Sequence, residues 1–185
     1  MTLFINACVR SESRTKKLAD YLLSKEEGPV TELRLGEIAF EPTDEAYLLR
    51  RDRLIAENRI DDPMFDLARQ FASADRIVIA APYWDLSFPA ALKQYLEKIS
   101  VTGVTFAYSP EGVPRGLCRA GELIYVTSAG GNYAPDAFGF GYVKALAENY
   151  YGIRRVRLVQ ALGLDLDGAD PEQILRGSFA EIDRL

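Results

Sequence analysis

Histidine is absent from this chain of 185 residues, and cysteine occurs only twice, as Cys8 and Cys118. The missing histidine excludes hydrolases that rely on an imidazole base and metal sites built from imidazole ligands. Two cysteines are too few for a disulfide framework and have no metal-ligand spacing, so we expect two reduced, packed thiols and no metal. Any chemistry must therefore come from other side chains or from a bound cofactor.

A long apolar run and an excess of positive charge are missing as well. No apolar stretch approaches the roughly 20 residues of a membrane-spanning helix, and the first ten residues lack the pattern of a secretory signal. The net charge is −5 at pH 7, so the positive field that attracts nucleic-acid phosphates is not present. We expect a cytoplasmic protein that binds neither nucleic acid nor a membrane.

Apolar runs with the character of strands alternate with amphipathic helical stripes. The runs span residues 2–8, 30–35, 76–82, 122–128 and 154–162, and three of them are apolar enough for strands covered on both faces. The stripes, which we interpret as core packing, comprise Leu18, Ala19, Leu22 and Leu23; Phe65, Ala68, Phe71 and Ala72; Leu92, Tyr95, Leu96 and Ile99; and Val143, Leu146, Ala147 and Tyr150.

This alternation predicts a parallel sheet with helices on both faces. At this length we predict one α/β domain over residues 1–185, a flavodoxin-like three-layer sandwich with a five-stranded parallel sheet in the order 2-1-3-4-5. Two segments are longer than a minimal βα repeat requires. Residues 36–63 are rich in charge, and residues 101–119 are rich in proline and glycine. The first is predicted to contain a helix at about residues 46–58, and either segment suits a lid, a binding loop or an interface.

The loop after the first predicted strand has the composition of an anion site. In "NACVRSESRTKKLADYL", residues 6–22, Ser13 or Thr15 is placed to cap the following helix, and the loop also carries Arg10 and Arg14. Free N–H groups at a helix start, hydroxyls and guanidinium groups favour an anion. The loop matches neither a Walker A motif nor a dinucleotide fingerprint. The loop composition favours a terminal phosphate monoester as the ligand. The alternative is that the serine only caps the helix and the arginines are solvated, which the same sequence would also allow.

Two more loops meet the same sheet edge in the predicted topology. Tyr83 and Trp84 follow the third strand between two prolines, and "TSAGGNY", residues 127–133, follows the fourth. Adjacent glycines let the backbone approach a flat ligand closely and leave N–H groups free to donate. A phosphate cradle, an aromatic wall and a glycine wall together predict a nucleotide-like ring with a phosphate tail.

Four segments carry a family resemblance, in order and over nearly the whole chain: "SRTKKLADYL", "IVIAAPYWDLSFPAALKQYLEKI", "GVTFAYSPEGVPRGL" and "YVTSAGGNY". They resemble the flavodoxin-like NAD(P)H:quinone oxidoreductases and FMN-dependent azoreductases. The resemblance implies that the FMN phosphate is held by Arg10, Ser11, Ser13, Arg14 and Thr15. It implies that the isoalloxazine and ribityl groups lie along Pro82, Tyr83, Trp84, Asp85 and Leu86. The other edge of the ring is then met by Ser128, Ala129, Gly130, Gly131 and Tyr133.

One departure from the family pattern concerns the ring-binding segment. The commoner form reads "PMYNF", whereas this chain reads "PYWDL", so Asp85 stands where an asparagine is usual. We therefore expect its backbone N–H, rather than its side chain, to donate to the flavin.

The resemblance also implies an activity and an assembly. The implied enzyme passes two electrons from NADH or NADPH through FMN to a quinone, azo or nitroaromatic acceptor by a ping-pong mechanism, and the flavin, not a catalytic side chain, performs the chemistry. A homodimer is expected, with "FAYSPEGVPRGL", residues 106–117, as aromatic and proline-rich surface beside the site. Two alternatives stay open, a flavodoxin-type one-electron carrier protein and a scaffold without flavin. Bound flavin would exclude the scaffold.

Overall fold

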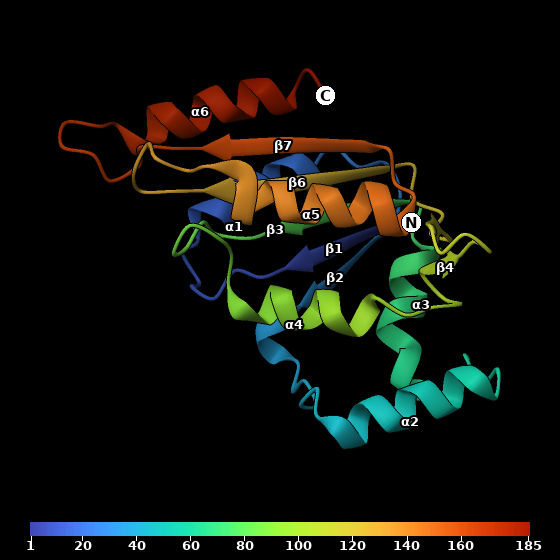
Figure 1. Cartoon of the computed structure of the whole chain (residues 1–185). Coiled ribbons are helices and arrows are strands. Elements are labelled where there is room, and N and C mark those ends of the chain that lie inside the picture. The colour runs from blue at the N-terminus through green and yellow to red at the C-terminus, as the bar shows by residue number, and fades with distance from the viewer.

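A five-stranded parallel sheet forms the centre of the computed structural model, which describes all residues 1–185 (Figure 1). The strands are β1 (Thr2–Asn6), β2 (Val30–Arg34), β3 (Arg76–Ala80), β6 (Glu122–Ser128) and β7 (Arg155–Ala161). They lie in the order β2-β1-β3-β6-β7. This confirms the predicted order 2-1-3-4-5 when the strands of this sheet are counted along the chain. The apolar runs at 2–8 and 76–82 extend past β1 and β3 because the chain leaves the sheet there to build loops.

Helices cover both faces of the sheet. One face packs against α1 (Arg14–Leu23) and α6 (Pro171–Ile182), and the other packs against α3 (Asp66–Ser73), α4 (Ala90–Ile99) and α5 (Phe140–Leu146). Alternate residues of each strand point to opposite faces, so Phe4 and Val78 belong to the first core and Leu3 and Ile77 to the second. Both faces being buried explains why these strands read as continuous apolar runs.

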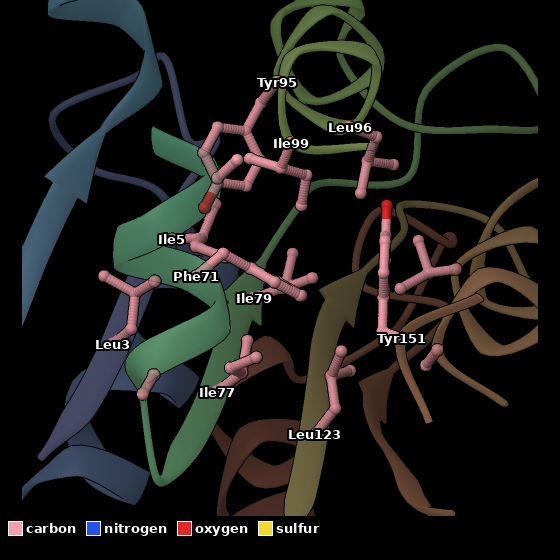
Figure 2. Packing of buried hydrophobic residues seen from close by; sticks show 14 of the residues in the cluster. Leu3, Ile5, Phe71, Ile77, Ile79, Tyr95, Leu96, Ile99, Leu123 and Tyr151 are labelled. Atoms are coloured by element: carbon pink, nitrogen blue, oxygen red, sulfur yellow. The ribbon is translucent and has the colours of Figure 1, made fainter. Parts of the chain in front are cut away.

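The second core is the larger of the two, and aromatic rings fill it. Figure 2 shows sheet residues and helix residues meeting there. The ring centroids of Phe71 and Tyr151 are 4.9 Å apart in an edge arrangement. Tyr151 belongs to a π-helical turn, η4 (Ala147–Tyr151), that continues α5. The extra residue of that turn brings Tyr151 into the core as well. Tyr150, which the predicted stripe placed in the core, is partly buried and packs against it.

The first insertion contains α2 (Glu45–Ala56), which confirms the helix predicted near residues 46–58. Asp44 caps it by accepting a hydrogen bond from the N–H of Tyr47. The helix lies at the edge of the molecule (Figure 1) and is fixed to α4 through Lys98, whose Nζ is 3.3 Å from the centroid of the Tyr47 ring and donates to Thr43 at 3.0 Å. Burial lowers the pKa of this lysine.

The second insertion forms an antiparallel hairpin of β4 (Phe106–Tyr108) and β5 (Pro114–Gly116), which no sequence pattern had assigned. Shorter helical turns complete the chain: η1 (Leu35–Glu37), η2 (Pro63–Phe65) and η3 (Asp136–Phe138). None of the helices has both the length and the apolar character that crossing a membrane requires.

Candidate functional site

A pocket of about 280 Å³ opens at the carboxyl edge of the sheet. The loops after β1, β3 and β6 converge on it, as predicted for the switch point of a doubly wound sheet. A fourth loop, which follows β7, completes one wall. The lining residues are Arg10, Glu12, Ser13, Arg14, Thr15, Pro82, Tyr83, Trp84, Ser128, Ala129, Gly130 and Asp165.

The start of α1 supplies the donors of the pocket. Ser13 is the N-cap, and its Oγ accepts a hydrogen bond from the N–H of Lys16 at 3.3 Å. The N–H groups of Ser13, Arg14 and Thr15 donate to no protein acceptor, which is the normal state of a helix start and leaves them available to an anion. The predicted cap is therefore confirmed.

A hydroxyl pair connects α1 to the end of β6. Thr15 is only 1% exposed, and its Oγ1 lies 2.7 Å from the Oγ of Ser128. Since one hydroxyl donates to the other, one hydroxyl hydrogen of the pair remains free for a further acceptor. This contact brings the first and third predicted loops together at the pocket.

The aromatic wall is held by a tight turn. Trp84 and Ser87 exchange two backbone hydrogen bonds, of 3.0 and 2.7 Å, around Asp85 and Leu86. These two residues have φ angles of 50° and 65°, the arrangement of a type I′ turn. The turn leaves the Trp84 side chain 39% exposed at the pocket wall. The N–H of Tyr83 donates to the carbonyl of Ser128 at 3.1 Å, which fixes the beginning of the turn against β6.

The glycine wall pairs with the loop after β7. The N–H groups of Gly163, Leu164 and Asp165 donate to the carbonyls of Gly131, Ala129 and Gly130, at 3.0, 3.2 and 2.9 Å. A Cβ atom on Gly130 would lie 2.3 Å from Oδ2 of Asp165. Glycine is therefore required at 130 for the carboxylate to lie where it does.

Asp165 lines the pocket, and the sequence analysis did not predict it. Arg14 donates to it through two parallel hydrogen bonds, Nη1 to Oδ1 at 2.8 Å and Nη2 to Oδ2 at 3.1 Å, and also to the carbonyl of Leu164 at 3.2 Å. The hydrogen bond from Arg14 lowers the pKa of Asp165, so the carboxylate is ionised at neutral pH. Its position just after the fifth predicted strand, at the ligand-binding edge, was a usable signal. Glu12, inside the first loop, was also missed.

Five of the predicted site residues do not line the pocket. Ser11 lies in a neighbouring groove beside Cys8 and Arg34. Asp85 and Leu86 form the exposed tip of the turn. Gly131 is also absent from the lining, and Tyr133 is 78% exposed. The structure therefore brings together the predicted phosphate loop, the first half of the aromatic segment and the first half of the glycine segment.

Comparisons with known proteins agree with this architecture. The Flavodoxin_2 family model, described as a flavodoxin-like fold, matches residues 1–185. An FMN-dependent NADH:quinone oxidoreductase from Lachnoclostridium phytofermentans is 35% identical over 182 residues, which cover 92% of this chain and 89% of that protein. One from Clostridium perfringens is 34% identical over 183 residues, covering 92% and 90%. The solved structure of an azoreductase from Bacillus anthracis matches with a TM-score of 0.84 at 23% identity, covering 99% of this chain and 96% of the other. The chain belongs to the Flavodoxin_2 family of flavodoxin-like proteins.

Proposed function

We propose that this chain is an FMN-dependent oxidoreductase that passes two electrons from NADH or NADPH to a quinone, azo or nitroaromatic acceptor. The observation that carries the proposal is the pocket itself, which joins a helix start with free N–H donors to an aromatic wall and a glycine wall. The FMN-dependent NADH:quinone oxidoreductases that match nearly the whole chain support the same activity.

The donor set fits a phosphate monoester. The free N–H groups at the start of α1, the hydroxyls of Ser13 and Thr15, and the guanidinium of Arg14 would hold the phosphate. The carboxylates of Glu12 and Asp165 also line the pocket and oppose an anion. The N–H, hydroxyl and guanidinium donors outnumber the two acids, so we assign this end of the pocket to the FMN phosphate.

The remaining walls suit a flat ring. Trp84 presents an aromatic side chain, and Gly130 has no side chain to keep a ring away. FMN accepts a hydride from a nicotinamide and passes electrons to an acceptor, so the protein supplies position and electrostatics rather than an acid–base pair. This division of roles is consistent with a chain that has no histidine.

Anaerobic stopped-flow mixing tests the proposal. The FMN-loaded protein is mixed with NADH or NADPH, and the reduced protein is then mixed with a quinone. We expect full reduction by at least one nicotinamide, followed by reoxidation in a single two-electron step. Failure of both nicotinamides, or transfer of single electrons only to a protein partner, would favour the flavodoxin-type carrier instead.

We further propose a cytoplasmic homodimer with the flavin near the interface. Exposed apolar side chains on the β4–β5 hairpin support this assembly: Tyr108, Val113 and Leu117. Light scattering at micromolar concentration is expected to give about twice the chain mass of 20.6 kDa. A fully active monomer would refute the dimer. Leu117→Lys is expected to shift the mass towards the monomer, whereas Leu49→Lys, on the exposed face of α2, is expected to leave it unchanged.

A further inference from the structure

The anion end of the pocket carries as many acidic as basic side chains. Arg10 and Arg14 line it together with Glu12 and Asp165. A site that only has to hold a phosphate tightly gains nothing from carboxylates on its wall, because like charges repel the ligand. The two acids differ in one respect: Asp165 is hydrogen-bonded to an arginine of the site, and no such bond is present for Glu12.

The position of Asp165 is fixed from two directions. Its N–H donates to the carbonyl of Gly130, and its carboxylate accepts two hydrogen bonds from Arg14 across the pocket wall. Its Oδ2 lies only 2.3 Å from the position that a Cβ of residue 130 would occupy. The carboxylate therefore lies between the glycine wall and the side chain that we assign to the phosphate.

Arg14 cannot donate fully to both the Asp165 carboxylate and a phosphate, so the affinity for the phosphate is lowered. Its Nη1 and Nη2 atoms both donate to Asp165, and Nη1 also donates to Leu164. A phosphate at the start of α1 either takes one of these hydrogen bonds from the carboxylate or binds beside a negative charge. Both outcomes weaken binding, and neither is relieved by protonation at neutral pH because the arginine keeps the carboxylate ionised.

We propose that Asp165 sets the affinity of the site, competing with the FMN phosphate for Arg14 so that FMN binds reversibly and exchanges with the free cofactor. This inference rests on the proposed function, because it assumes that the anion is the phosphate of FMN. Asp165 is in this sense an affinity-determining residue that acts through Arg14 and takes no part in electron transfer.

Titration of the apoprotein with FMN and with riboflavin, followed by quenching of flavin fluorescence, tests the proposal. Asp165→Asn keeps the size of the side chain and removes its charge, and we expect it to lower the Kd for FMN by roughly three- to tenfold. The Kd for riboflavin, which has no phosphate, is expected to stay the same. FMN dissociation is expected to slow by a similar factor. The gain is expected to shrink when the salt concentration rises from about 0.05 to 0.5 M.

Two further variants serve as controls. Asp167→Asn removes the same charge from an exposed residue of the same loop, and it is expected to leave the Kd for FMN unchanged. Asp165→Ala repeats the charge removal without an amide, so that the effect does not depend on new hydrogen bonds of asparagine. Thermal unfolding of each apoprotein shows whether it is folded. If one of the two Asp165 variants does not fold, the other one is used for the comparison.

The results separate the two proposals. Weaker or unchanged FMN binding in the Asp165 variants would overturn the inference, because the carboxylate would then position Arg14 or play no part. A gain of equal size for riboflavin, or for Asp167→Asn, would overturn it as well. If the wild-type protein binds riboflavin as tightly as FMN, the phosphate site itself fails, whatever the variants do.

Discussion

At the scale of single residues, the anion end of the pocket depends on Arg14. This residue begins α1, and its side chain reaches the loop after β7, so it connects the first and last parts of the chain that build the site. The ion pair with Asp165 is more than half exposed on the carboxylate side, and its own contribution to stability is small because solvent screens it. We therefore expect this ion pair to affect ligand binding rather than folding.

Arg14→Ala is expected to weaken FMN binding by about 1.5–3 kcal/mol, because it removes a charge-assisted hydrogen bond and leaves Asp165 unpaired beside the phosphate. Riboflavin binding is expected to change little. In the Arg14→Ala background, Asp165→Ala is expected to recover part of the loss because the repelling carboxylate is gone. Fluorescence titration of both flavins measures these changes, and Lys17→Ala, exposed on the same helix, is the control for lost positive charge. An equal loss for both flavins would contradict the assignment.

At the scale of an element, the turn Trp84–Ser87 holds backbone strain beside the pocket. Leucine rarely adopts a positive φ, and the 65° of Leu86 costs about 1–2 kcal/mol relative to glycine. Asp85 fits its φ of 50° more easily, because aspartate tolerates this region. Strained residues of this kind cluster at functional sites, so we expect the Leu86 side chain to contribute to acceptor binding.

Leu86→Gly is therefore expected to raise the free energy of unfolding by up to about 1 kcal/mol, the strain relieved less the extra chain entropy of glycine. The same variant is expected to raise the KM for the aromatic acceptor, because an apolar side chain near Trp84 is lost. Leu86→Ala is the matched control: it loses the side chain but keeps the strain, so KM should rise without any gain in stability. Urea unfolding and steady-state kinetics measure the two effects. A stability gain in both variants would show that the φ angle is not the cause.

The β4–β5 hairpin is attached through a close approach of two backbones. A Cβ on Gly116 would lie 2.2 Å from the backbone N of Gly152 and the backbone C of Tyr151. Neither atom can move alone, so Gly116→Ala is expected to lower the free energy of unfolding by about 1–3 kcal/mol or to displace the hairpin. Gly121→Ala, where a Cβ meets nothing within 4 Å, is expected to be nearly neutral. Urea unfolding compares them, and equal effects would contradict a tight hairpin contact.

The elements also show what could be predicted from the sequence. Strands that are covered on both faces, such as β3 (Arg76–Ala80), can be recognised in the sequence as apolar runs. The strand order then follows from the predicted fold. The β4–β5 hairpin was not predicted because its strands have only three residues each and one of them begins with Pro114. The predicted stripe correctly placed Tyr150 against the core but missed Tyr151, because a π turn cannot be read from helical spacing. Asp165 was not predicted because its hydrogen bonds with Arg14 join residues that are 151 positions apart in the sequence.

At the scale of the whole molecule, the two edges of the sheet carry different groups of residues. The carboxyl edge holds the pocket, and the amino edge holds a cluster of ion pairs. In that cluster Arg76 binds both Glu26 and Glu122, at 2.9 Å in the second case, and Arg157 binds Glu122 at 2.8 Å. Glu26 and Glu122 are 9% and 13% exposed at their side chains, so these pairs are shielded from solvent far more than the Arg14–Asp165 pair. These ion pairs therefore hold the strands together at the end of the sheet away from the pocket.

The pH dependence of stability is expected to have a flat centre and a falling acid limb. No histidine titrates between about pH 5.5 and 8. Hydrogen bonds and ion pairs lower the pKa values of Asp75, Asp165 and Asp183 below their usual 3.8. The unfolded chain then binds more protons in acid, so stability is lost as the pH falls through these lowered values. Urea unfolding at intervals from pH 3 to 8 measures this, and a step near pH 6 to 7 would contradict it.

The alkaline limb is expected to be steeper, and Cys118 to be a main cause. Burial raises the pKa of this thiol from 9.0 to about 12, and burial also raises that of Cys8. Above pH 9 the unfolded chain loses these protons while the folded protein keeps them, so stability falls as the pH rises, by up to about 1.4 kcal/mol per pH unit for each thiol. Cys118→Ala and Cys118→Ser are expected to reduce the slope between pH 9 and 10 by the same amount, although their stabilities at pH 7 differ, because both remove the titrating group. Urea unfolding at pH 7, 9 and 10 gives the slopes. A slope that matches the wild type in both variants would show that Cys118 is not the group that destabilises the protein in alkali.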